Sequence, residues 1–124
     1  MPKSVLVVDD DAIVRQMLCC VLALEADFTV CGEAVNGREA IEKAQALRPD
    51  VILMDLSMPV MNGIEATRLL KTLIPTVPVI VFSDYGDVFS EEEALSAGVV
   101  LISKSENMSV LIDRVRALLY PAEA

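Results

Sequence analysis

Acidic side chains stand directly after two short apolar runs of the sequence. Asp9 and Asp10 follow the run at residues 5–8, and Asp55 follows the run at residues 51–54. Two unit charges about 5 Å apart repel each other by roughly 3 kcal/mol at an effective dielectric constant near 20, so three carboxylates held together need a compensating cation. Carboxylate and carbonyl oxygens suit Mg²⁺, which usually keeps several waters as well. If the two runs end at one place in the fold, these residues predict a magnesium site.

A hydroxyl and a lysine come after two further apolar runs. Ser83 directly follows residues 79–82, and Lys104 stands two positions after the run at residues 99–102. A carboxylate such as Asp55 can act as a nucleophile toward phosphorus and form an acyl phosphate. A fixed lysine and a hydroxyl donor would offset the charge on the phosphoryl oxygens. These residue types favour phosphoryl transfer to Asp55 over the simpler interpretation, which is a set of solvated loop residues and an ordinary surface lysine.

The apolar runs are typical of strands in a buried parallel sheet. Four of them, at residues 5–8, 51–54, 79–82 and 99–102, are unbroken and rich in β-branched residues, as expected for strands covered on both faces. Residues 29–34 predict a weaker strand nearer an edge. Ligands of an open parallel α/β sheet bind beyond the carboxyl ends of the strands. This arrangement would bring the acidic residues, the hydroxyl and the lysine to one rim.

Helical spacing fills the stretches between the strands, so the β-α order repeats five times and implies helices on both faces of the sheet. Asn or Ser followed three residues later by Glu marks three helix starts, and Asp11 is expected to cap the first helix. The helix predicted around residues 90–97 has few large apolar residues, so we expect it to be the most mobile. The apolar sets are Ile13, Met17, Val21 and Leu24; Ile41, Ala44 and Leu47; Ala66, Leu69, Leu70 and Leu73; Leu111, Val115 and Leu118; the capping pairs are Asn36 with Glu39, Asn62 with Glu65, and Ser90 with Glu93.

The composition narrows the class of protein. A chain of 124 residues fits one domain, which we expect to span residues 1–124. Its 19 acidic and 10 basic residues give a net charge of −9, which argues against nucleic-acid binding by this segment because phosphate contacts need Lys and Arg. No apolar run approaches the roughly 20 residues that cross a bilayer, and the N-terminus is unlike a signal peptide. We therefore expect a cytoplasmic protein without membrane contact.

The cysteines and glycines exclude several kinds of site. Cys19, Cys20 and Cys31 form no C-x-x-C pair and the chain has no histidine, so a zinc site has too few ligands. We expect buried free thiols instead. Without histidine, no mechanism can use a histidine base from this chain. Neither a P-loop nor a G-x-G-x-x-G phosphate-binding motif is present.

Taken together, these residues resemble the receiver domains of two-component response regulators over nearly the whole chain. The resemblance implies a flavodoxin-like (βα)5 fold, a five-stranded parallel sheet of order 2-1-3-4-5 with helices on both faces. Gly32-Glu33-Ala34 with Asn36-Gly37-Arg38-Glu39-Ala40 is similar to the subclass whose receivers often precede a helix-turn-helix DNA-binding domain. The matching pieces are Val7-Val8-Asp9-Asp10-Asp11, residues 49–63 with the acceptor aspartate followed by M-P-x-M-x-G, Ser83, and Lys104.

The resemblance also implies roles at the matching positions. Asp55 would be the phosphoacceptor and a Mg²⁺ ligand, Asp10 a direct ligand, Asp9 a ligand through water, and Ser57 a ligand through its backbone carbonyl. Family members take the phosphoryl group from the phosphohistidine of a sensor histidine kinase. They catalyse this step, and usually their own dephosphorylation, without turning over a separate substrate. At the remaining positions, Ser83 would be the switch hydroxyl and Lys104 the cation that pairs with phosphate.

Two positions depart from the family pattern and leave a second function open. Asp84 follows the switch hydroxyl, where family members usually have a small residue, and Leu101 stands where a switching aromatic residue is common. The expected output surface is the face formed by the fourth helix, fifth strand and fifth helix, through which two copies could form a homodimer. The alternative function is a phosphorylation-independent interaction or dimerisation module. A haloacid-dehalogenase-like phosphatase is a third hypothesis, but it needs a second aspartate where Ser57 stands.

Overall fold

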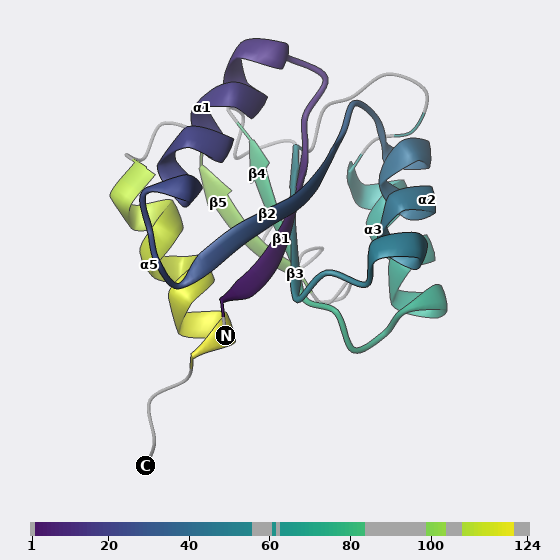
Figure 1. Ribbon diagram of the computed structural model, residues 1–124. Coiled ribbons are helices and arrows are strands. Elements are labelled where there is room, and N and C mark those ends of the chain that lie inside the picture. Colours follow the sequence, from purple (N-terminus) through teal and green to yellow (C-terminus); the bar gives the residue numbers. More distant parts are fainter. Residues whose placement is uncertain (1, 56–60, 62, 84–98, 104–107, 121–124) are drawn as a thin grey trace.

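The structure, a computed structural model, describes residues 2–55, 61, 63–83, 99–103 and 108–120. The strands form one parallel sheet in the order β2-β1-β3-β4-β5, which confirms the predicted fold and strand order (Figure 1). The helix predicted around residues 90–97 lies outside the described residues. The strands are β1 (Lys3–Val8), β2 (Phe28–Ala34), β3 (Val51–Asp55), β4 (Val79–Ser83) and β5 (Val99–Ser103), and the described helices are α1 (Ala12–Ala23), α2 (Gly37–Leu47), α3 (Gly63–Leu73) and α5 (Met108–Leu119).

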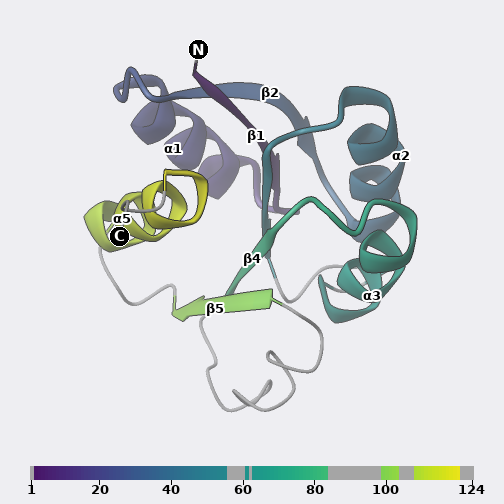
Figure 2. The same cartoon turned by 90° about the horizontal axis from the view of Figure 1, so that it is seen from below.

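The sheet is covered by helices on both faces. Helices α1 and α5 lie on one face, and α2 and α3 lie on the other (Figure 2). Side chains of the central strands alternate between the two layers, since successive residues of a strand point to opposite faces. In β1, Val5 and Val7 pack with Leu18 of α1, whereas Leu6 and Val8 join the cluster beneath α2 and α3. This two-sided burial explains why the strands read as continuous apolar runs.

Strand β2 lies at an edge of the sheet, as its weaker apolar pattern predicted. Its pairing with β1 shifts by one position, because Val5 pairs with Val30 and Leu6 pairs with Gly32. Cys31 is the extra residue of this β-bulge. Because of it, each later side chain of β2 faces the opposite side of the sheet from the one that strict alternation would give. The bulge allows Ala34 to pair with Val8 at the carboxyl end of β1.

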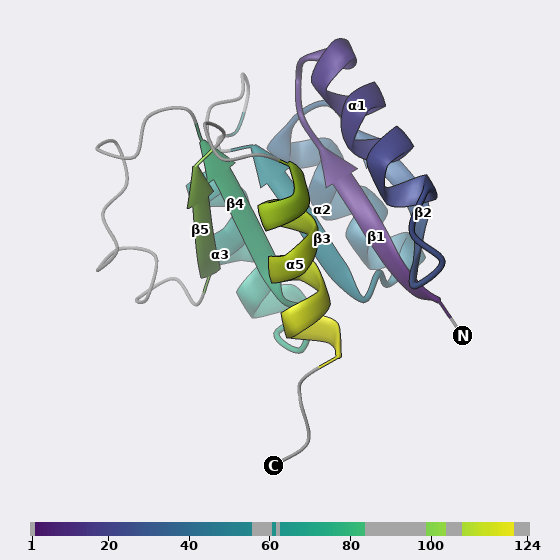
Figure 3. The same ribbon diagram turned by 90° about the vertical axis from the view of Figure 1, so that its left-hand side faces the viewer.

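Helix α1 forms where predicted, but its buried side is different from the one its spacing suggested. Leu18 and Leu22 are buried, whereas Ile13 is 70% exposed and Leu24 is 85% exposed. Met17 is also exposed, on the outward side of α1. Residues 12–23 contain only one charged residue, so the helix is apolar on most of its circumference and periodicity alone could not select the buried stripe. The result is an exposed, uncharged stripe formed by Ile13 and Met17 of α1 and by its C-cap residue, Leu24. Helices α1 and α5 face the viewer in Figure 3.

The helix ends follow ordinary capping chemistry. Asp11 caps α1, because its carboxylate accepts from the backbone N–H groups of Ile13 and Val14. Asn36 caps α2 by accepting from the N–H of Glu39 at 2.8 Å. Arg48 ends α2 in the left-handed region, with φ 50° and ψ 61°, a position that glycine usually occupies. Among the described residues, no helix has the length and apolar content needed to cross a membrane.

Candidate functional site

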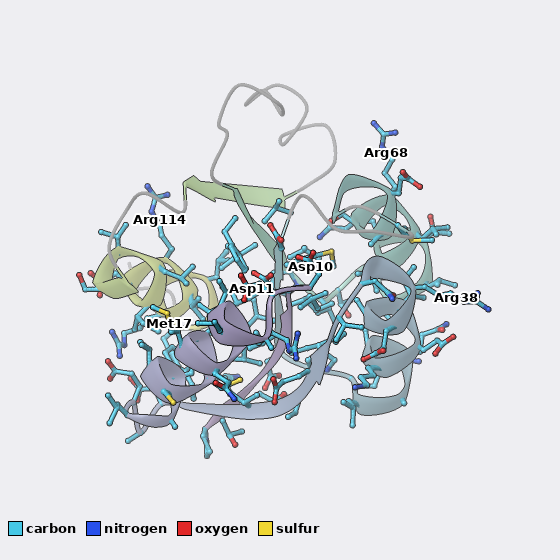
Figure 4. The ribbon with its side chains drawn as sticks, turned by 90° about the horizontal axis from the view of Figure 1, so that it is seen from above. Asp10, Asp11, Met17, Arg38, Arg68 and Arg114 are labelled. Atoms are coloured by element: carbon cyan, nitrogen blue, oxygen red, sulfur yellow. The ribbon has the colours of Figure 1, made fainter. Side chains whose placement is uncertain are left out.

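The carboxyl ends of β1 and β3 bring three aspartates together. Val8 pairs with Met54 in the register of these neighbouring strands, so the next residues, Asp9 and Asp55, reach the same rim. Ligand oxygens of Asp9, Asp10 and Asp55 all lie within 4.8 Å of one another. Asp9 is fully buried and Asp55 is 4% exposed, whereas Asp10 is exposed at the start of the loop that leads into α1 (Figure 4). The predicted convergence of these three residues is confirmed.

Backbone contacts fix the loop that carries the first two aspartates. The N–H of Asp9 donates to the carbonyl of Ala34 at 3.1 Å, which extends the β1–β2 pairing by one residue. The carboxylate of Asp9 accepts from the N–H of Asp11 at 2.8 Å. Asp11 in turn caps α1, so the expectation that it has a capping role is confirmed. The acidic loop is therefore tied both to the sheet and to the first turn of α1.

An arginine that was not predicted as a site residue contacts this loop, and a glutamate, also not predicted, pairs with that arginine. Arg15 is the only charged residue of α1, and its guanidinium donates through Nη1 to the backbone carbonyl of Asp9 at 2.8 Å. Its Nε donates to the carboxylate of Glu33 in β2 at 3.3 Å. Lys43 of α2 donates to the backbone carbonyl of Glu33. The sequence signal that could have identified Arg15 is a single arginine, one turn after Asp11, in a helix without any other charged residue.

The remaining predicted site residues are placed only in part. Ser83 is the last residue of β4 and pairs with Ser103 of β5, one position beyond the pairing of Asp55 with Phe82. The backbone of Leu101 in β5 pairs with Val81. The other three predicted residues, Ser57, Asp84 and Lys104, lie outside the described residues.

The donor set of the acidic cluster fits a hard divalent cation. Three carboxylates within 4.8 Å of one another repel strongly, and a cation relieves that repulsion. Oxygen donors with an exposed side, here at Asp10, match Mg²⁺, which binds through one or two carboxylates and keeps several waters. The chemistry of the residues present is therefore compatible with the predicted magnesium site.

The three cysteines are free, as predicted, but none of them is buried, so the expectation of buried thiols is wrong. Cys20 is exposed, and Cys19 and Cys31 are half-buried. Burial raises the pKa of the Cys19 thiol above its ordinary value, and the nearby negative charge of Glu33 acts in the same direction. Burial likewise raises the pKa of Cys31. A raised pKa keeps these two thiols protonated and less reactive near neutral pH.

Known proteins with this fold and sequence pattern identify the family. The family model for the response regulator receiver domain matches residues 5–116. The chain is 45% identical over 98 residues to the chemotaxis protein CheY of Thermotoga maritima, an alignment that covers 79% of this chain and 81% of CheY. The chain therefore belongs to the family of response-regulator receiver domains of two-component systems.

Solved structures agree with this assignment. The response regulator domain of Thermotoga maritima CheB superposes with a TM-score of 0.88 at 34% identity, covering 99% of this chain and all of that domain. CheY in the CheX-CheY-BeF₃-Mg²⁺ complex of Borrelia burgdorferi gives a TM-score of 0.87 at 26% identity, covering 95% of this chain and 90% of that one.

Other relatives are much longer than this chain. It spans 34% of a protein-glutamate methylesterase/protein-glutamine glutaminase of Methanosarcina acetivorans. It spans 43% of the transcriptional regulatory protein LnrK of Bacillus subtilis. The receiver unit thus occurs both within an enzyme and within a transcriptional regulatory protein.

Proposed function

We propose that the chain accepts a phosphoryl group on the carboxylate of Asp55 and uses the resulting acyl phosphate as a switch. The observation that carries the proposal is the convergence of Asp55 with Asp9 and Asp10 at the carboxyl ends of β1 and β3. Family membership supports it, as does the CheY relative whose structure contains BeF₃ and Mg²⁺. The phosphorylation-independent module is not favoured, because interaction alone would not need three mutually repelling carboxylates.

In the proposed transfer, a carboxylate oxygen of Asp55 attacks the phosphorus of a phosphohistidine. The P–N bond of the donor breaks and its electron pair stays on the imidazole nitrogen, while a P–O bond forms on Asp55. Asp55 is only 4% exposed, so the surrounding atoms restrict the motion of its side chain. This restriction lowers the entropic cost of aligning the reacting atoms. The chain would thus catalyse its own modification.

The residues that would hold Mg²⁺ are Asp10 and Asp55 directly, Asp9 through water, and the backbone carbonyl of Ser57. When bound, the ion neutralises charge on the phosphoryl oxygens. We further propose Ser83 as a hydroxyl donor to a phosphoryl oxygen and Lys104 as the cation that pairs with another. The place of Ser83 at the end of β4, one position beyond the Asp55–Phe82 pair, supports its role.

A sensor histidine kinase is the proposed phosphodonor. The donor must reach Asp55 from the rim where β1 and β3 end, and α1 begins at that rim with Asp11 as its cap. The exposed, uncharged stripe on α1 offers an apolar surface beside the acidic cluster.

We propose that phosphorylation shifts a pre-existing equilibrium at the surface formed by residues 90–97, β5 and α5, where a second copy would bind. Asp84, which follows the switch hydroxyl, would modify the phosphoryl transfer. Leu101, which stands in place of the switching aromatic residue, would modify how phosphorylation changes this surface.

Incubation with Mg²⁺ and acetyl phosphate tests the proposal. One phosphoryl group should add to the wild-type chain, as detected by intact-mass spectrometry. Asp55→Asn should abolish the addition. Asp50→Asn is a matched control, because Asp50 stands just before the opposite end of β3 and accepts hydrogen bonds from Ser4. Absence of a mass shift in the wild type, or an undiminished shift in Asp55→Asn, would contradict the proposal.

A further inference from the structure

The contacts of Arg15 differ from those of an ordinary surface arginine. Its side chain is 17% exposed, although an arginine on a helix of a small domain would normally extend its head into water. The guanidinium instead makes two directed contacts, one to a backbone carbonyl and one to a carboxylate. A guanidinium presents several donors in a rigid plane, so it can bind both acceptors at once.

The carbonyl that Arg15 contacts belongs to the peptide that leads into the acidic cluster. The carbonyl of Asp9 and the N–H of Asp10 lie in one rigid plane. The other side of Asp9 is already held, because its N–H donates to Ala34. The hydrogen bond from Arg15 therefore restrains the orientation of the Asp9–Asp10 peptide, the peptide that precedes the Cα atom of Asp10.

Glu33 keeps the guanidinium in this position. Its carboxylate contacts Nε of Arg15 at 3.3 Å, and its backbone carbonyl accepts from Lys43. The carboxylate of Glu33 thereby pairs with the positive charge of Arg15, while Nη1 of Arg15 donates to the neutral backbone carbonyl of Asp9. Arg15 is thus placed to orient the acidic loop through the backbone.

We propose that Arg15 is a positioning residue that sets the affinity of the acidic cluster for Mg²⁺ by holding the Asp9–Asp10 peptide. This inference rests on the proposed function, because it concerns the same metal site. Groups that orient metal ligands typically affect metal affinity by about tenfold or more. Simple electrostatics gives the opposite sign: removal of a positive charge near three carboxylates strengthens cation binding. The direction of the change therefore separates positioning from charge.

The test measures the dissociation constant for Mg²⁺ by isothermal titration calorimetry in the wild type and four variants. Arg15→Met should weaken binding about tenfold, and Arg15→Lys should restore part of the loss, since an ammonium can still donate to the carbonyl. Glu33→Gln should stay near the wild type, because the amide oxygen still accepts from Nε. Arg38→Met is the matched control: Arg38 is exposed on α2, pairs with Glu42, and lies away from Asp10 (Figure 4).

Two further readouts separate positioning from misfolding. The thermal midpoint of Arg15→Met in EDTA shows whether the fold is retained, and Arg15→Lys carries the test if it is not. At saturating Mg²⁺, the rate of phosphorylation by acetyl phosphate should return close to the wild-type rate. Equal or tighter Mg²⁺ binding by folded Arg15→Met would overturn the inference alone, and where that variant does not fold, equal or tighter binding by Arg15→Lys would do so. A wild type that binds no Mg²⁺ would overturn the proposed metal site as well.

Discussion

The guanidinium of Arg116 on α5 lies 3.1 Å from the carboxylate of Asp27, 89 positions earlier in the chain. The same guanidinium pairs with Glu25 and lies 5.6 Å from the ring centre of Phe28. Tyr120 adds a hydrogen bond from its hydroxyl to the carbonyl of Asp27. The end of the last helix is therefore attached to the turn between α1 and β2.

Arg116→Ala is expected to weaken this attachment and lower the thermal midpoint. The hydrogen bond with Asp27 raises the pKa of Arg116, and the charges of Glu25, Asp27 and Asp113 act in the same direction. In 1 M salt the Debye length is only about 3 Å, so charge interactions are screened. The difference in thermal midpoint between the wild type and Arg116→Ala should therefore be smaller at this salt concentration. Arg114→Ala, two residues earlier and exposed (Figure 4), is the control. Equal midpoints for the two variants would show that the attachment has no effect on stability.

Gly37→Ala is expected to destabilise the fold by about 1–3 kcal/mol, because overpacking a rigid neighbour has this cost. A Cβ at Gly37 would lie 2.6 Å from the carbonyl oxygen of Met61 and 3.0 Å from Ala66 Cβ. Gly32→Ala is the matched control, since a Cβ there would meet the flexible end of Leu47 at 2.8 Å, and that side chain is partly exposed. Urea unfolding should show a clear loss for Gly37→Ala and a smaller one for Gly32→Ala. The reverse order would be incompatible with these contacts.

Arg48→Gly should stabilise the protein by about 1 kcal/mol, which is the usual cost of a left-handed conformation for a residue with a Cβ. Arg48 has φ 50° at the end of α2. Arg48→Ala removes the same charge but keeps the Cβ, so its stability should stay near that of the wild type. Chemical denaturation of the three proteins measures the differences. Equal gains for Gly and Ala would assign the effect to charge instead of backbone conformation.

Repulsion within the acidic cluster predicts that Asp10→Asn stabilises the metal-free protein. Ligand oxygens of Asp10 lie within 4.8 Å of those of Asp9 and Asp55. The Coulomb repulsion of roughly 3 kcal/mol at this spacing is reduced by solvent because Asp10 is exposed, so a gain of about 1 kcal/mol in EDTA is expected. Added Mg²⁺ should raise the thermal midpoint of the wild type more than that of Asp10→Asn. Glu42→Gln, an exposed change on α2, should show no gain in EDTA.

The half-buried thiols predict a loss of stability at alkaline pH. The pKa values of Cys19 and Cys31 are raised in the fold above the ordinary value of 9.0. Well below pH 9.0 both thiols are protonated in the folded and in the unfolded chain, so the stabilising contribution is complete. As the pH rises through the folded pKa values, the unfolded chain has already lost its protons, so this contribution disappears. Urea unfolding between pH 8 and roughly pH 11 measures the free energy of unfolding at each pH. This free energy should decline less steeply with pH for the double variant Cys19→Ala, Cys31→Ala than for the wild type. Parallel curves would contradict a contribution of these two thiols to the pH dependence.

Most of the sheet could be predicted from sequence because each central strand is a short β-branched run. The three aspartates of the site could be predicted as well, since parallel strands end at a common rim and Asp9, Asp10 and Asp55 directly follow two of those runs. The buried side of α1 could not be predicted. Leu18, Leu22, Ile13 and Met17 are all apolar, and only the position of the helix on the sheet decides which two are covered.

Arg15 and Glu33 were missed for a related reason. Their contact joins α1 to β2 across 18 positions of sequence, and it depends on the register of an edge strand. Local patterns specify that register weakly, because β2 has few buried side chains.

The extra residue in β2 determines which layer each later side chain of that strand faces. Val30 faces the α1 and α5 side with its partner Val5, whereas Cys31 packs on the α2 and α3 side. Because of the bulge, Glu33 is opposite Val7 and shares its direction toward α1. If β2 kept Cys31 but paired without the bulge, Cys31 would lie opposite Leu6, and strict alternation would place Glu33 opposite Val8 and turn its carboxylate toward α2. The register at one residue of an edge strand thus supplies Arg15 with its counter-ion, and a change in that register alone would separate the two charges without changing either residue.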